Sequence, residues 1–98
     1  LMFSARLINH NNTRMLNICD ADLLGRTLNR DNFSLKISQE YYTDKVVEKE
    51  EAKDLLKESD NINMVGKEII SLSVDIGVGS QGGIKIIDGI PFLIVFKM

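Results

Sequence analysis

The C-terminal stretch of residues 84–95 constrains the fold more than any other part of the chain. Two apolar, β-branched segments flank the pair Asp88-Gly89. Such a pair between apolar segments is typical of a β-hairpin, because the tight turn needs positive φ angles that Asp and Gly tolerate. The sequence therefore predicts two paired strands, the second of them deeply buried, and the rest of the chain must supply the strands and helices that cover them.

The 98 residues of the chain are enough for one globular domain, 1–98, with a single core. The sequence is 44% hydrophobic and 27% charged, as in an ordinary globular protein. Its longest apolar run, Ile90–Phe96, is too short to span a bilayer, and no signal peptide is recognisable, so we expect a cytoplasmic protein with no membrane contact. The single cysteine, Cys19, excludes an internal disulfide.

Period-2 alternation predicts an N-terminal hairpin, with strands around residues 3–7 and 15–19 joined by an Asn-rich turn. Asp20 is expected to cap a short helical turn that Gly25 ends. Residues 26–32 are interpreted as a polar connection to a third strand, which alternates over residues 33–37.

The second half of the chain contains the clearest helical pattern, at residues 47–59, with apolar residues on one face and charges on the other. Residues 61–66 are interpreted as a connection. Residues 66–76 fit a strand and a helix about equally well by periodicity, with Gly77 suited to the end of a helix. A glycine-rich loop at 77–83 precedes the C-terminal hairpin.

The order of several short motifs resembles an archaeal family of small uncharacterised proteins, domain of unknown function 424. The motifs are Met2-Phe3, Ile18-Cys19-Asp20, Leu23-Leu24-Gly25, Leu35-Lys36-Ile37-Ser38 with Tyr41-Tyr42, the acidic helix, Val65-Gly66-Lys67-Glu68 and Gly89-Ile90-Pro91. The resemblance implies a helix at 66–76 and brings an association with translation-factor genes, but no established activity. Thr43-Asp44 and Phe92-Leu93-Ile94 depart from the family pattern.

Few residues of this chain suit catalysis or metal binding. His10 is expected in an exposed turn, and Cys19 on a strand is expected to be a small buried apolar side chain beside Asp20. Asp20 and Asp22 lack the further oxygen ligands of a calcium loop. The glycine loop lacks the Gly-Lys-Ser/Thr of a phosphate loop. We therefore expect no catalytic residues, no metal and no cofactor.

The charges are distributed unevenly along the chain. Residues 1–39 carry five basic and three acidic groups, a net charge of +2, whereas residues 40–98 carry seven basic and eleven acidic groups, a net charge of −4. Arginine suits bidentate contact with phosphate, and exposed tyrosines can stack on unpaired bases. The candidate nucleic-acid-binding residues are Arg6, Arg14, Arg26, Arg30, Tyr41 and Tyr42. The alternative is that these arginines cover sheet edges and pair with Asp20, Asp22 and Asp31, while one tyrosine packs in the core.

The pattern as a whole predicts a two-layer α+β fold, with a mainly antiparallel sheet of about five strands and two longer helices on one face. We expect a non-catalytic binding protein, an RNA or ribonucleoprotein accessory of translation. The alternative from another class is a protein–protein interaction module or homodimer. A small enzyme acting on a nucleotide or phosphate ligand near Gly79–Gly83 is the third hypothesis.

Overall fold

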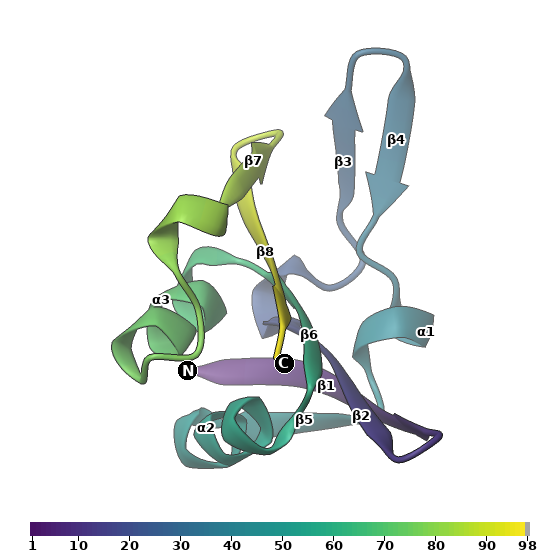
Figure 1. The fold of residues 1–98 in the computed structure, drawn as a ribbon. Helices are drawn as coiled ribbons and strands as arrows, with labels where there is room; N and C mark the ends of the chain where they lie inside the picture. The colour runs from purple at the N-terminus through teal and green to yellow at the C-terminus, as the bar shows by residue number, and fades with distance from the viewer. Residues whose placement is uncertain (98) are drawn as a thin grey trace.

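A computed structural model describes residues 1–97 and has a two-layer α+β architecture (Figure 1). A six-stranded sheet has the strand order β5-β1-β2-β6-β8-β7, and a separate hairpin pairs β3 with β4. The strands are β1 (Met2–His10), β2 (Thr13–Asp20), β3 (Thr27–Arg30), β4 (Phe33–Lys36), β5 (Lys45–Glu48), β6 (Asn61–Val65), β7 (Lys85–Ile87) and β8 (Ile90–Phe96). The helices are α1 (Gln39–Tyr42), α2 (Lys49–Glu58) and α3 (Lys67–Asp75), with two 3-10 turns, η1 (Ala21–Leu23) and η2 (Gln81–Gly83).

The sheet is mainly antiparallel, as predicted, and within residues 1–97 only the central pair β2 and β6 runs parallel. Parallel strands need a long connection between them, and here the chain from β2 to β6 includes the β3–β4 hairpin, α1, β5 and α2. The first strand along the chain, β1, pairs with β2 on one side and with β5 on the other.

Helices α2 and α3 lie against the same face of the sheet, on the left of the view in Figure 1. The alternating residues Leu16 and Ile18 of β2 point into this layer and are fully buried. Ala52 and Leu56 of α2 meet them from the helical side. Alternation in the strands and helical spacing in α2 and α3 thus produce one apolar core between the two layers. We call this side of the sheet the helix face and the other side the open face.

The C-terminal hairpin is confirmed, and its turn residues Asp88 and Gly89 have φ angles of 50° and 77°. The prediction that its second strand is deeply buried is wrong. On β8 only Leu93 is buried, whereas Ile94 is 59% and Phe96 70% exposed. The strand is covered by helices on one face only, so its alternate side chains remain on the open face.

Two further segments differ from the sequence-based interpretation. Residues 61–65 form β6, the strand at the centre of the sheet, and residues 27–30 form β3. The sequence predicts connections at both places, because polar residues such as Asn61 and Asn63 obscure the period-2 pattern. The predicted helix at 47–59 begins at Lys49, since the preceding residues pair with β1 as β5. The predicted helix at 66–76 is confirmed as α3.

Candidate nucleic-acid interface

The β3–β4 hairpin projects from the open side of the sheet as an arm (Figure 1). Residues 26–36, which we call the basic arm, carry Arg26, Arg30 and Lys36 against one acid, Asp31. The arm therefore has a net charge of +2, and the remainder of the chain −4. All three cations are exposed, and none forms an ion pair with another residue in the described range 1–97.

The root of the basic arm is fixed to the body of the protein. Leu28 is buried in a second apolar cluster with Ile37, on the open face of the sheet. Ile37 donates its backbone N–H to the Arg26 carbonyl at 2.9 Å. Farther out, Asn29 donates its backbone N–H to the Asp88 carboxylate in the C-terminal hairpin turn at 3.0 Å. The arm is thus held in position while its tip, including the 56%-exposed Phe33, remains accessible.

The structure places Arg6 and Arg14 on opposite faces of the sheet. In the β1–β2 register, Arg6 is opposite Asn17, and Arg14 is opposite Asn9. Residues 14 and 17 are three apart on β2, so their side chains point to different faces. Arg6 lies on the open face, where its Nη1 donates a hydrogen bond to the backbone carbonyl of Glu40 in α1. The four arginines therefore do not form one patch.

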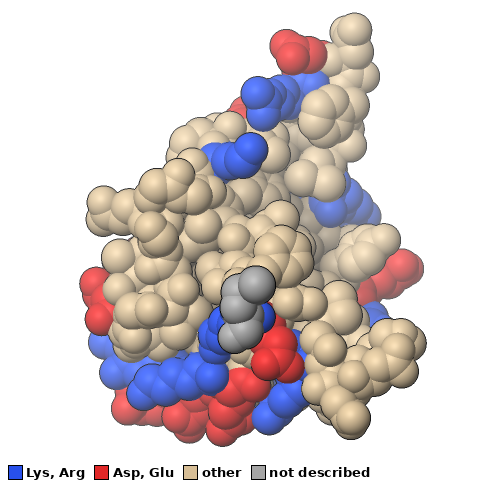
Figure 2. Space-filling model, viewed as in Figure 1, with Lys and Arg blue, Asp and Glu red and all other residues tan. Residues whose placement is uncertain are grey.

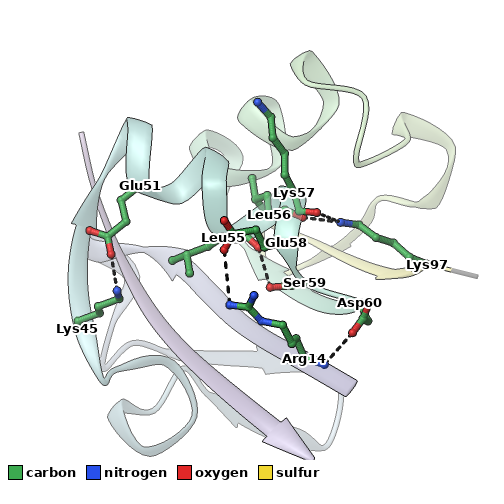
Figure 3. A network of polar contacts seen from close by, with 10 residues as sticks. All are labelled: Arg14, Lys45, Glu51, Leu55, Leu56, Lys57, Glu58, Ser59, Asp60 and Lys97. Carbon is green, nitrogen blue, oxygen red and sulfur yellow. Dashed lines mark hydrogen bonds and ion pairs between the residues drawn. The ribbon is translucent and has the colours of Figure 1, made fainter. Parts of the chain in front are cut away.

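Arg14 belongs to a polar network at the end of α2 (Figure 3). Its guanidinium lies 3.6 Å from the Glu58 carboxylate, and its backbone N–H donates to the Asp60 carboxylate at 2.8 Å. In the same network, Lys97 Nζ donates to the carbonyls of Leu56 and Lys57. Arg14 thus has a structural role on the helix face and is separated from the basic arm.

The two tyrosines have different environments. Tyr41 on α1 is 64% exposed and remains available for stacking. Tyr42 is buried, so its ring cannot stack on a ligand, and the alternative in which one tyrosine lies in the core is confirmed for this residue. Burial raises the pKa of Tyr42 to about 12, and its hydroxyl accepts a hydrogen bond from the Asn63 amide at 3.3 Å.

The uncovered part of the open face contains residues that the sequence analysis did not select. We call this surface the asparagine face, and it consists of Met15, Asn17, Asn61, Asn63, Ile94 and Phe96 around a shallow hollow of about 200 Å³. Asn63 of β6 is opposite Asn17 of β2 and Ile94 of β8 in the sheet register. Asparagine is uncommon in strands, so its presence among the apolar residues of these segments was the sequence signal that could have selected this surface.

Charged side chains are sparse on this surface. Figure 2 shows blue and red side chains crowded at the lower left, over α2, and mainly blue side chains along the arm at the upper right, with red at its tip. The surface between these two regions is largely tan. The residues lining the hollow include no acid. An acidic ligand can therefore approach the open face without meeting a carboxylate in the hollow itself.

Asp20 caps a helix, but a different one from that predicted. Its side chain makes no capping hydrogen bond in η1. Its two carboxylate oxygens accept the backbone N–H groups of Glu68 at 3.0 Å and Ile69 at 2.8 Å, in the first turn of α3. Burial raises the pKa of the Asp20 carboxyl, against the opposing effect of these two hydrogen bonds. The residue therefore joins β2 to α3.

The other two candidate reactive groups, Cys19 and His10, have different environments. Cys19 is fully buried, and burial followed by the charges of Asp20 and Asp22 raises its thiol pKa to about 12. His10 is exposed at the end of β1. Within residues 1–97 no three His, Cys, Asp or Glu side chains come together in a group that could bind a metal ion.

The glycine-rich loop folds back on α3. The backbone N–H groups of Val78 and Gly79 donate to the Ser73 carbonyl at 2.9 and 3.0 Å, and that of Gly77 donates to Val74. These donors satisfy carbonyl groups that the end of a helix leaves without partners. They do not converge on an external anion, in contrast to the donors of a phosphate loop.

The sequence matches the profile of a family described as "Protein of unknown function (DUF424)" over residues 8–98. The chain belongs to this family. Its structure is similar to one described as "Crystal structure of an uncharacterized conserved protein from Methanopyrus kandleri", with a TM-score of 0.81 and 26% sequence identity. That match covers 100% of this chain and 95% of the other. No curated protein matches the sequence.

These matches confirm the family that the motif order suggested, and they assign no activity to it. Among the described residues 1–97, no helix has the length and apolar character needed to cross a membrane.

Proposed function

We propose that this member of the family is a non-catalytic RNA-binding protein, an accessory to a ribonucleoprotein of translation. The observation that carries the proposal is the basic arm, which places a net charge of +2 on a projecting hairpin of an otherwise acidic chain. Cations that lack protein partners can replace the counterions condensed on phosphates, which makes them effective contacts for nucleic acid.

The arm also carries groups besides its cations that suit RNA. Phe33 near the tip is exposed and offers an aromatic surface on which a base can stack. Arg26 and Arg30 can each contact a phosphate through two parallel N–H donors. Because the root of the arm is anchored by Leu28 and by the Asn29–Asp88 hydrogen bond, little ordering is required when it binds.

The test is the binding of purified protein to structured RNA and ribosomal particles at two salt concentrations, beside an acidic protein of equal size. We expect salt-dependent binding above that control. The triple variant R26Q/R30Q/K36Q should weaken binding and reduce the slope of log K against log salt by about 2, since each lost phosphate contact removes about 0.7 to 0.9.

A matched control is available on the helix side of the molecule. Lys49, Lys57 and Lys67 are exposed, and none forms an ion pair with another residue between positions 1 and 97. The variant K49Q/K57Q/K67Q removes the same charge from α2 and α3. If both triple variants weaken binding equally, net charge alone explains the effect and the arm has no specific role.

The exposed Ile94 and Phe96 on β8 favour a second candidate, a protein–protein contact or homodimer through the open face. Large exposed apolar side chains next to one another mark contact surfaces in many proteins. Sedimentation equilibrium over a wide concentration range tests the dimer. A concentration-independent monomer mass would contradict it.

A further inference from the structure

We propose that the asparagine face binds the bases of single-stranded RNA, while the basic arm and Arg6 hold its phosphates. This inference rests on the proposed RNA-binding function and adds the class of RNA and the surface that reads it. It follows from the side chains that the sheet register places together on the uncovered part of the open face.

The register defines two neighbouring rows across four strands. One row runs from Arg6 through Asn17 and Asn63 to Ile94, and the next runs from Ile8 through Met15 and Asn61 to Phe96. Neighbouring strands lie about 4.8 Å apart, so the side chains within each row are close neighbours. Each row therefore combines amide groups with apolar surface.

The amides suit the edges of unpaired bases. A side-chain amide offers two donors and one acceptor group, and asparagine can bond a base in a bidentate way. Asn17 and Asn61 make no side-chain hydrogen bond to another residue within the range 1–97. The Asn63 amide nitrogen donates to the buried Tyr42 hydroxyl. This hydrogen bond fixes the Asn63 side chain and leaves the Asn63 side-chain oxygen for a ligand.

Phe96 supplies the stacking surface. Its side chain is 70% exposed at the end of β8, beside Asn61 in the register. An aromatic ring on an open sheet face can stack on a base of any sequence. Paired bases in a duplex are stacked and hydrogen-bonded already, so this surface should select single strands.

Charge complementarity favours RNA over a second copy of the chain. The hollow contains no acid, Arg6 lies in one of its rows, and the basic arm projects from the same side of the sheet. A two-fold dimer built on this face would bring Arg6 of both copies to an interface whose hollow offers no carboxylate to pair with it, which costs free energy. A polyanion would meet them favourably.

The experiment compares an unstructured ten-nucleotide RNA with a duplex RNA of the same length, by fluorescence anisotropy. We expect wild-type protein to prefer the single strand. Phe96→Ala should lower its affinity for the single strand about tenfold and leave the salt slope unchanged, because stacking involves no counterion release. Asn17→Asp should also weaken single-strand binding, since a carboxylate cannot donate to a base and repels phosphate.

Ile86→Ala is the matched control. Ile86 is 58% exposed on β7, and it is opposite Pro91, whose side chain shares the helix face with Leu93. Removing this apolar side chain should not change binding. Spectra of backbone amides establish that each variant is folded, and in the wild type they should show perturbations on β2, β6 and β8 when the single strand is added.

Three results would overturn the inference, and they can be told apart. Salt-dependent RNA binding that is lost in R26Q/R30Q/K36Q but unchanged in Phe96→Ala and Asn17→Asp would leave the arm as the whole interface. An absence of salt-dependent binding to either RNA would contradict the proposed function itself. A dimer that Phe96→Ala dissociates would assign the asparagine face to self-association.

Discussion

Ile69 donates its backbone N–H to the Asp20 carboxylate at 2.8 Å, across 49 residues of sequence. The same carboxylate accepts the N–H of Glu68, so one side chain at the end of β2 satisfies two donors of α3. Gly66 lies directly beside it with a φ angle of 117°, and a Cβ atom there would overlap the Asp20 side chain. The absence of a side chain at Gly66 therefore permits this cap.

Asp20→Ala should lower the free energy of unfolding by about 1–3 kcal/mol, because it leaves two N–H groups at the start of α3 without their acceptor. Urea denaturation at pH 7 measures the change. Asp22→Ala is the control, since Asp22 is exposed and makes no side-chain hydrogen bond to other residues in the described chain, and we expect a change below about 0.5 kcal/mol. Equal effects of the two substitutions would contradict the cap.

Lys97→Ala should destabilise the protein by about 1 kcal/mol, because the ammonium group donates to two carbonyls at the end of α2. The loss of stability should be smaller at high salt, because salt screens the interaction of the Lys97 charge with the end of the helix. Lys85→Ala removes an exposed lysine from β7 and serves as the comparison. If amide exchange in the last turn of α2 is as slow in Lys97→Ala as in wild type, the lysine does not cap this helix.

Cys19 should make the protein less stable as the pH rises above 9. Its thiol pKa is raised from 9.0 to about 12 in the folded state, so between these values the folded chain retains a proton that the unfolded chain releases. The associated loss is about 1.4 kcal/mol per pH unit. Between pH 8 and pH 10 the free energy of unfolding of the wild type should therefore fall by about 1.4 kcal/mol relative to that of Cys19→Ala. Parallel pH profiles would show that the thiol is not perturbed.

Asp88→Ala should loosen the basic arm, because it removes the acceptor for the Asn29 backbone N–H and places alanine at a φ angle of 50°. We expect exchange of the Asn29 amide to become about tenfold faster, which corresponds to local opening of the arm. Asp88→Asn keeps an oxygen acceptor and tolerates positive φ, so its exchange should stay close to that of wild type. NMR measures the exchange of the Asn29 amide in both variants. Equal exchange rates in Asp88→Ala and Asp88→Asn would show that the Asn29–Asp88 hydrogen bond does not hold the arm.

Local sequence determined the N-terminal and C-terminal hairpins of this protein and helix α2. The Asp88-Gly89 turn and the alternation in β1 and β2 were readable because both depend on residues close in sequence. The spacing of apolar residues in α2 determined which side of that helix is buried. The motif order also identified the family.

Tertiary structure alone decided where the functional candidates lie. The register of β1 and β2 placed Arg6 and Arg14 on opposite faces, and the pairing of β2, β6 and β8 brought Asn17 and Asn63 together. The pairings of β6 with β2 and β8 join strands that are distant in sequence, and in any of these strand pairs a shift of one residue would reverse every side chain. Likewise, Asp20 reads locally as a cap for the turn that follows it, but its partners become apparent only when α3 packs beside β2.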